Sequence, residues 1–302
     1  MSVLYDAPGP VTKRRERIGS IIGLVLIAGG LVALAFALGA PRVSANGAEQ
    51  PGMFDPSRWD IFTDLALWRG VLDGVWGTLR MAGVAAVLAI LVGIAFSFGR
   101  TARSAFVRVP VMVILEFFRG MPVLLMMLFI LLVFSTGAYA AGVLALGIYN
   151  GAIIGEALRA GIASLPKGQR ESGLAIGLTP VQTRMLIEFP QAFRQMLPII
   201  IAQLVVLLKD TSLAYVIGYP ELLRKVVNQM SNFYGNRYFF SLFFLTLVIY
   251  LAINLTLSWV ARYVAKRSGP RLGKALPNTP KPTGGEGTRA ITLPRWRGDE
   301  PT

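Results

Sequence analysis

The chain contains no cysteine and no histidine among its 302 residues. Without cysteine it forms no disulfide bond and no thiolate metal site, and without histidine it lacks the usual proton shuttle and the commonest metal ligand. We therefore expect no metal site, no cofactor and no catalytic residue. An intramembrane enzyme is also disfavoured, because each of the few carboxylates in the apolar segments has a basic residue close to it and no catalytic pair stands out.

Charged residues are scarce as well, at 15% of the chain, whereas hydrophobic residues make up 54% and the mean hydropathy is +0.58. Soluble domains rarely have this composition. Apolar windows of about 20 residues, long enough to cross a hydrocarbon core, recur along the sequence. The chain is therefore predicted to be an all-α membrane protein with several spans.

The formal net charge of +14 raises the alternative of a nucleic-acid partner. Most lysines and arginines lie in short flanks beside the apolar segments, where the positive-inside bias and anionic lipid headgroups place them. We therefore expect this charge to face membrane lipids, and we expect no nucleic acid partner.

Residues 1–17 are polar and end in a basic cluster, and residues 18–38 form an almost unbroken apolar segment. A cleavable signal peptide is the alternative, since Val43-Ser44-Ala45 resembles a cleavage site. The apolar segment is longer than the roughly 7–15 residues of a typical signal sequence, however. We expect a retained first helix with its basic flank in the cytoplasm, followed by an external loop to residue 73 with Trp59 and Trp68 at headgroup level.

Five further apolar segments are predicted to span the membrane, at residues 74–98, 106–134, 138–163, 196–219 and 238–264. The second of these is interrupted by charged residues and by Gly120 and Pro122, which predict a bend. Six spans, with the basic N-terminal flank inside, place both termini in the cytoplasm. Most arginines lie on the predicted cytoplasmic side and support this orientation, whereas Arg224, Lys225 and Arg237 lie on the predicted external side.

Two regions flank the predicted core, which covers residues 74–267. The first helix with its external loop, residues 18–73, precedes the core. Residues 268–302 follow it and are rich in Pro, Gly and Thr. This tail cannot bury enough apolar area to offset the entropy of ordering, so we expect it to be disordered and cytoplasmic.

A polar segment, residues 164–195, separates the fourth and fifth spans. Residues 167–178 can form a short amphipathic helix with one carboxylate, Glu171, on its apolar face. Gly177 suits the C-terminal cap of this helix, while Thr179 suits the N-cap of a second helix and Pro180 its first position. We therefore expect two short helices meeting at a tight bend.

This segment has a recognisable layout, with Glu171-Ser172-Gly173, then Gly177, then Ile187-Glu188-Phe189-Pro190. The spacing resembles the EAA loop of ABC-importer permeases, which docks on a cytoplasmic ATPase. The alternative is an ordinary amphipathic loop at the membrane interface.

Other stretches extend this resemblance to the permease subunits of polar amino acid ABC importers, over about residues 74–267. They are EFFRGMP at 116–122, EALRAGI at 156–162, LPKGQ at 165–169, PQA at 190–192 and KDTSL at 209–213. Related glutamate permeases also carry an added first helix.

The resemblance implies the type I importer fold and a bacterial plasma membrane protein that imports a polar amino acid, most plausibly glutamate or a relative. It implies an assembly with an ATPase dimer, a second permease subunit, identical or homologous, and an external solute-binding protein. The chain itself has no phosphate-binding Gly-Lys-Thr/Ser loop, so ATP hydrolysis is expected from a separate subunit.

The implied ATPase-docking residues are Glu171, Ser172, Gly173, Gly177, Ile187 and Pro190. The sequence departs from the family pattern at Ser172 and Gly173, where alanines are usual, and at Phe189, where leucine is usual. These changes keep small or apolar character, so docking should survive. Met121 stands where threonine is common, which removes one polar contact.

Two glutamate–arginine pairs stand at i,i+3 inside the spans: Glu116 with Arg119, and Glu156 with Arg159. A lone charge at this depth costs at least about 2.5 kcal/mol, so we expect structural ion pairs. The alternative is direct substrate contact. Arg119 remains a candidate for the substrate pathway, because its cation could meet the carboxylate of an acidic substrate.

Four consecutive polar residues, Lys209, Asp210, Thr211 and Ser212, lie well inside the fifth span. They point around the helix, so some must face a partner subunit or a wet pathway. Thr211 and Ser212 can also return hydrogen bonds to their own backbone. A role in the pathway or gate and a role in subunit packing both stay open.

An ion-coupled secondary transporter is the competing function. Such a protein is expected to show inverted repeats or broken helices with coordinating groups in both halves, and neither is apparent in the sequence. We expect a pore subunit that moves its substrate by alternating access.

Overall fold

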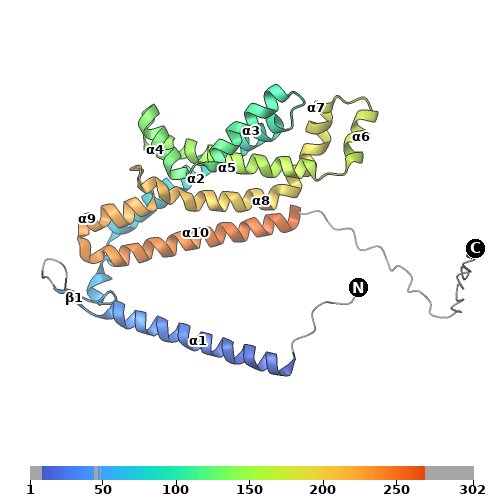
Figure 1. Ribbon diagram of the computed structural model, residues 1–302. Helices are drawn as coiled ribbons and strands as arrows, with labels where there is room; N and C mark the ends of the chain where they lie inside the picture. Colours follow the sequence, from blue (N-terminus) through green and yellow to red (C-terminus); the bar gives the residue numbers. More distant parts are fainter. Residues whose placement is uncertain (1–8, 44–46, 48, 269–302) are drawn as a thin grey trace, which may run out of the picture. The chain divides into compact units, whose positions relative to one another are not determined.

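The computed structural model describes residues 9–43, 47 and 49–268. The predicted C-terminal tail therefore lies, apart from Ser268, outside the described residues, as does the start of the predicted N-terminal segment. Within the described residues the fold is almost entirely helical, as predicted (Figure 1).

Helix α1 covers Pro10–Gly39 and begins ahead of the predicted residue 18. Proline is well suited to the first position of a helix, because its missing N–H is not needed there. Two short strands follow, β1 (Arg42–Val43) and β2 (Glu49–Gln50), which pair as an antiparallel hairpin that the all-helical prediction omitted.

The predicted external loop is shorter than expected, since α2 (Leu65–Arg100) begins at Leu65 and not at residue 74. The Asp64 side chain caps this helix by accepting a hydrogen bond from the Ala66 amide at 2.8 Å. Before it, the loop forms two single turns of 3-10 helix, η1 (Pro56–Arg58) and η2 (Asp60–Thr63).

Arg58 and Trp59 hold this loop in place. The Arg58 guanidinium is almost fully buried and donates to the carbonyl oxygens of Pro51 and Arg237. The Trp59 ring packs edge-on against Phe240 and Phe244. The loop is thus fastened to the last helix that the structure describes and to the turn that precedes it.

The third predicted span is broken into α3 (Ala105–Gly120) and α4 (Val123–Phe134), which are bent by 104°. Gly120 and Pro122 lie at or beside the break, as the sequence predicted. Among the described residues, five helices are long and apolar enough to cross a membrane, or six if this bent pair counts as one span.

Helix α5 (Ala138–Ala163) packs along α2, and this contact is the most extensive between any two helices of the described chain. Glycines on α5 allow the close approach. A Cβ added at Gly151 would lie 3.0 Å from the Ala89 carbonyl oxygen, and one at Gly155 would lie 3.0 Å from that of Gly93. Small residues at such interfaces let helix backbones approach within a membrane.

The polar segment and the fifth span form one long helical path. It consists of α7 (Pro180–Thr183), a π-helical turn η3 (Arg184–Glu188), α8 (Phe189–Asp210) and the 3-10 turn η4 (Thr211–Tyr215). The predicted start of this span at residue 196 was therefore wrong, because the helical path begins at Pro180. The second of the two predicted short helices, α7, is the beginning of the span. Within the polar segment of residues 164–195, α6 (Lys167–Ala175) is the short helix that stays separate from this path.

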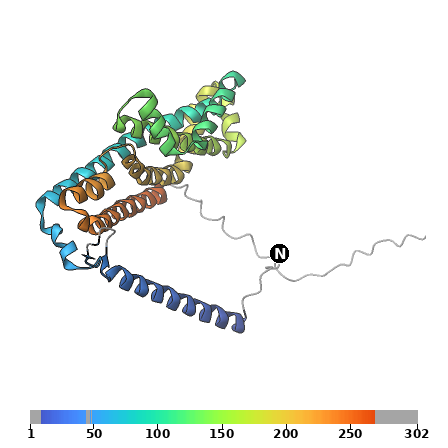
Figure 2. The same cartoon turned by 60° about the vertical axis from the view of Figure 1, so that its left-hand side comes forward.

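The last span is α10 (Phe239–Ser268), which runs beside α8 in both ribbon views (Figures 1 and 2). Between them, the chain forms a π-helical stretch η5 (Leu223–Met230), α9 (Ser231–Tyr234) and the 3-10 turn η6 (Asn236–Tyr238).

This connection packs closely on α2. Gly77 approaches the Pro220 carbonyl so closely that an added Cβ would lie 2.8 Å from its oxygen. The Thr78 hydroxyl accepts a hydrogen bond from the Leu222 amide at 3.1 Å. Further along, the Tyr234 hydroxyl donates to the Asp64 carboxylate at 2.6 Å, which raises the pKa of Tyr234 to about 12.

We predict that Gly155→Ala lowers the stability of the folded protein by about 1–3 kcal/mol, because the added methyl group meets backbone that cannot move aside. The measurement is the thermal unfolding midpoint of the purified protein in detergent. Gly83→Ala in α2 is the matched control, since an added Cβ there has no atom within 4 Å and alanine favours the helix. Equal midpoints for both variants would contradict the close approach of α2 and α5.

Candidate functional site

Helix α6 packs against the beginning of the fifth span through Gly173. An added Cβ at Gly173 would lie 2.6 Å from Thr183 Cγ2 and 2.9 Å from Ile187 Cδ1. Gln191 Nε2 strengthens this contact by donating to Gln169 Oε1 at 3.1 Å. The absence of a side chain at Gly173 therefore lets α6 rest directly on the α7–η3 path.

The turn between α6 and α7 has the caps predicted from the sequence. Gly177 has a φ of +87°, a conformation that favours glycine, and its amide donates to the Leu174 carbonyl. Thr179 forms a capping box with Gln182, in which each side chain accepts a hydrogen bond from the backbone amide of the other residue.

The π-helical turn η3 ends at Glu188, two residues before Pro190. Within it, the Phe189 amide donates to the Arg184 carbonyl, five residues earlier. Proline lacks an amide hydrogen and clashes with the carbonyl four residues before it, so a wider turn at this point accommodates it within a continuous helix. Pro190 therefore does not interrupt the path from α7 into α8.

The α6–α7 segment, defined as residues 167–188 and comprising α6, α7 and η3, combines one exposed carboxylate with exposed apolar side chains. Glu171 is exposed and has no hydrogen-bond or ion-pair partner within the described part of the chain. Ser172 is also exposed and donates to the Gly168 carbonyl at 2.7 Å. The exposed large apolar residues of this segment are Leu174, Ile176, Val181, Met185 and Leu186.

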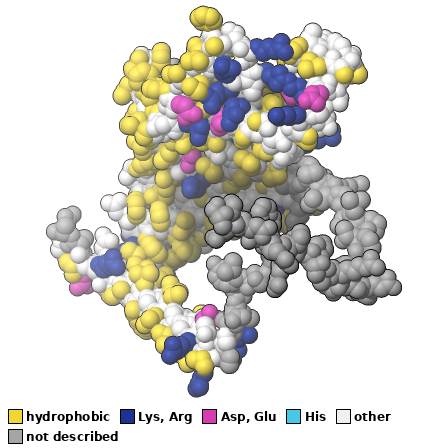
Figure 3. Space-filling model, turned by 45° about the vertical axis from the view of Figure 1, so that its right-hand side comes forward, with side chains coloured by type: hydrophobic (Ala, Val, Ile, Leu, Met, Phe, Trp, Pro, Cys, Tyr) yellow, Lys and Arg dark blue, Asp and Glu magenta, His cyan; other side chains and the backbone are white. Residues whose placement is uncertain are grey.

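A basic pocket of about 570 Å³ lies between α6 and the ends of the neighbouring helices. Figure 3 shows lysine and arginine side chains gathered on one part of the surface. The pocket is lined by six basic residues, Arg100, Arg108, Arg159, Lys167, Arg170 and Arg184. Two carboxylates, Glu171 and Glu188, also line it.

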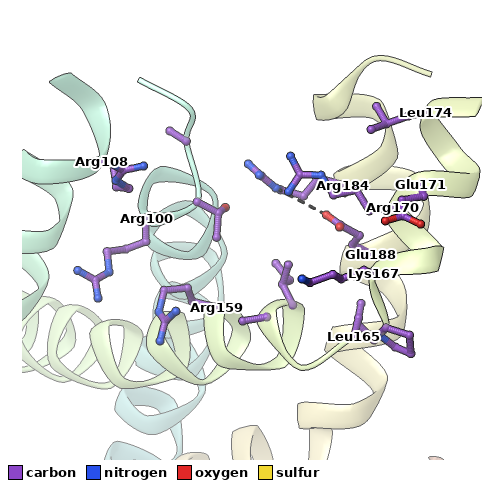
Figure 4. A pocket seen from close by; sticks show the side chains of 15 residues that line it. Arg100, Arg108, Arg159, Leu165, Lys167, Arg170, Glu171, Leu174, Arg184 and Glu188 are labelled. Carbon is purple, nitrogen blue, oxygen red and sulfur yellow. Dashed lines mark ion pairs between the residues drawn. The ribbon is translucent and has the colours of Figure 1, made fainter. Parts of the chain in front are cut away.

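The arginines come from two sides of the basic pocket. In Figure 4, Arg100, Arg108 and Arg159 lie on one side, whereas Arg170 and Arg184 lie on the other. Glu188 is nearly buried and its Oε2 is 3.9 Å from Arg184 Nε, a distance that allows an ion pair but no hydrogen bond.

The predicted pair of Glu156 and Arg159 is present, with Arg159 Nη2 2.7 Å from Glu156 Oε1. Sequence reasoning missed a third member, since Arg100 Nη2 is 3.4 Å from Glu156 Oε2. Arg100 ends α2 at the level where α5 carries Glu156, and only the parallel packing of these two helices reveals the contact. Glu156 therefore links two spans as well as one helical turn.

The predicted pair of Glu116 and Arg119 is also present, at 3.4 Å, but both side chains are exposed. Within the described residues neither side chain forms a further hydrogen bond or ion pair. It lies on the turn of α3 that precedes the bend.

The four polar residues of the fifth span divide into two groups. Thr211 is fully buried and donates to the Leu208 carbonyl at 2.6 Å, and Ser212 donates to the Lys209 carbonyl at 2.9 Å. These are the backbone hydrogen bonds that the sequence left as an alternative. The side chains of Lys209 and Asp210 have no hydrogen bond or ion pair among the residues that the structure describes.

Two buried polar links escaped the sequence analysis. Gln203 Nε2 on α8 donates to Asn150 Oδ1 on α5 at 2.7 Å. Glu221 is fully buried and accepts hydrogen bonds from the Tyr250 hydroxyl at 2.5 Å and from the amides of Leu223 and Arg224. A polar residue in an apolar run is the only local signal for Asn150, and the Pro-Glu start of a helical turn is the signal for Glu221.

No group of three carboxylates within the described residues is arranged to hold a metal ion. The chemical features of the site are instead an exposed surface on α6 and α7, a basic pocket behind it and a continuous helical path into the fifth span.

The family model and the similar proteins that match this chain all describe membrane components of transport systems. Residues 85–269 match the model of the binding-protein-dependent transport system inner membrane component. The chain is 41% identical over 189 residues to the glutamate transport system permease protein of Corynebacterium glutamicum, covering 60% of this chain and 69% of that protein. It is 35% identical to a probable glutamine ABC transporter permease protein of Bacillus subtilis, covering 53% and 76%.

Solved structures show the same fold. A chain in the crystal structure of an amino acid ABC transporter with histidines has a TM-score of 0.61 and 26% identity, covering 69% of this chain and 98% of that one. A chain of an inward-facing methionine ABC transporter has a TM-score of 0.51 and 18% identity, covering 67% and 99%. The second likeness concerns the fold alone.

We predict that Glu156→Gln destabilises the protein by about 1–3 kcal/mol, because it leaves the largely buried Arg100 and the partly buried Arg159 without their shared carboxylate. Thermal unfolding in detergent measures the effect. Glu116→Gln is the control and should cost at most about 1 kcal/mol, since an exposed pair is weak. A larger loss for the control than for Glu156→Gln would overturn this ranking.

Proposed function

Because the chain belongs to the binding-protein-dependent transport system inner membrane component family, we propose that it couples ATP hydrolysis in a partner to amino acid import. It is a multi-pass protein of the plasma membrane and a permease subunit of an ABC importer for polar amino acids. These relatives set the ion-coupled secondary transporter aside. The chain supplies the transmembrane pathway, and a separate subunit hydrolyses ATP.

The observation that carries the coupling role is the continuous helical path from the α6–α7 segment into the fifth span. The α7–η3–α8 path has no flexible break, and α6 is fastened to it at Gly173 and Gln191. A displacement applied to the surface of α6 would therefore also move the beginning of α8. Packed helices shift between discrete arrangements and do not deform continuously, so they can transmit a displacement from one end to the other.

The docking surface consists of Glu171 with the exposed apolar residues of the α6–α7 segment. An apolar helix face with one unpaired carboxylate suits a groove on a partner protein. We assign Glu171 and Ser172 to direct ATPase contact. Gly173 and Ile187 hold α6 in place, while Gly177 and Pro190 shape the turns on either side.

The substrate that we propose is glutamate or a related amino acid, as the names of the relatives indicate. Lys209 and Asp210 are the residues of the fifth span that we place on the substrate pathway or gate, because neither side chain forms a hydrogen bond or an ion pair in the described chain. Arg119 is a further pathway candidate beside the bend of α3 and α4. Thr211 and Ser212 then shape the helix end through their backbone hydrogen bonds.

The assembly that fits this role contains two permease subunits, an ATPase dimer and an external solute-binding protein. The pore partner is a second copy or a homologue. Both termini are assigned to the cytoplasm, which places the α6–α7 segment on the side of the ATPase.

We predict that Glu171→Arg abolishes ATP-dependent uptake while the protein remains inserted, because repulsion replaces attraction at the docking surface. Uptake into proteoliposomes and co-purification of the cognate ATPase are the measurements. Glu49→Arg is the matched control, since Glu49 is also exposed but lies in the β-hairpin far along the chain from α6. Normal uptake by Glu171→Arg would refute the docking role.

A second variant tests the substrate pathway. Lys209→Gln is expected to reduce uptake of glutamate more than uptake of glutamine, because only glutamate carries a side-chain carboxylate for the cation to attract. Competition between the two labelled substrates measures the ratio. An unchanged ratio would remove Lys209 from the pathway.

A further inference from the structure

The basic pocket lies at the membrane boundary, at the level of the span ends. Arg100 is the last residue of α2, and Lys167 is the first residue of α6. Arg159 precedes the end of α5 at Ala163 by about 6 Å along the helix axis. Headgroup phosphates of a bilayer occupy this level, just outside the hydrocarbon core.

The charge of the basic pocket is strongly unbalanced. Six basic side chains line it together with only two carboxylates. One of these, Glu171, is exposed on α6, and the other, Glu188, already forms an ion pair with Arg184. An anion that entered the pocket would therefore meet an excess of positive charge.

Two buried guanidinium nitrogens add a geometric reason for a ligand. Nε of Arg100 and Nε of Arg184 are buried and have no hydrogen-bond partner among the described residues. Each of these side chains is only 13% exposed. A buried donor without a partner costs free energy, and an anion in the pocket could relieve that cost.

We propose that the basic pocket binds a phosphate group, either from an anionic phospholipid or from a free phosphate ester. Arginine forks match phosphate oxygens in geometry, and basic pockets between transmembrane helices on the cytoplasmic side hold anionic headgroups. The apolar residues Ile162 and Leu165 line the same pocket. They provide a surface for the glycerol and the start of an acyl chain, which favours the lipid as the source.

The pocket has room for more than a phosphate ion. Its volume of about 570 Å³ falls within the range of pockets that hold small organic ligands. A phosphatidylglycerol headgroup, with its glycerol, is of this class. This inference uses only the permease chain, so it stands whether or not the ATPase docks at Glu171.

The test is native mass spectrometry of the full-length chain in detergent, titrated with phosphatidylglycerol and, separately, with phosphatidylcholine. The test variant combines Arg108→Gln with Arg170→Gln, because both side chains are exposed and have no ion-pair partner in the described chain, so that we expect their loss to cost little stability. The control combines Arg194→Gln with Arg262→Gln, which removes two exposed arginines outside the pocket.

We expect phosphatidylglycerol to bind the wild type more tightly than phosphatidylcholine. The test variant should lose roughly fivefold in phosphatidylglycerol affinity for each arginine removed, and the control should retain its affinity. A parallel titration with glycerol 3-phosphate and inorganic phosphate identifies the source. Binding of these soluble anions that is lost in the test variant supports the same phosphate chemistry with a free ester as the ligand.

Two results would overturn the proposal. The first is equal affinity of wild type and test variant for every phosphate-bearing probe. The second is an equal loss in the control, which would show a diffuse attraction to the whole basic surface.

Discussion

Close contact between helix backbones is the constraint on which this structure depends. In hydrocarbon there is no water to drive apolar surfaces together, so helices associate by packing and by hydrogen bonds between them. Glycines at 151 and 155 bring α5 against α2, and Gly77 brings the 220–222 turn against the same helix. The same device recurs outside the spans, where Gly173 lets α6 rest on the fifth span. A partner that moves α6 would therefore act on the bundle through contacts that have little slack.

The sequence predicted best where local chemistry decides the structure. Gly177, Thr179 and Pro180 each specify one cap or helix start, and all three have the predicted role. The bend at Gly120 and Pro122 is likewise local. The pair of Glu156 and Arg159 followed from helical spacing alone.

The errors arose where packing between distant segments decides. Helix α2 begins at Leu65 because Asp64 caps it and Arg58 and Trp59 fasten the preceding loop to α10. The turns after Pro220 are helical because they pack on α2, and Glu221 is satisfied by Tyr250 from another helix. Arg100 joins Glu156 only because α2 and α5 are neighbours. The basic pocket could not be predicted either, since its residues come from separate stretches of sequence.

The central claim is that this chain forms the pathway of an ATP-driven amino acid importer. The most direct measurement is uptake of radiolabelled glutamate, glutamine and arginine into proteoliposomes that contain the chain with its cognate permease partner, ATPase and binding protein. The account predicts uptake that requires both ATP and the binding protein, with glutamate or a close relative preferred. An assembled complex that hydrolyses ATP but takes up none of these amino acids would contradict it.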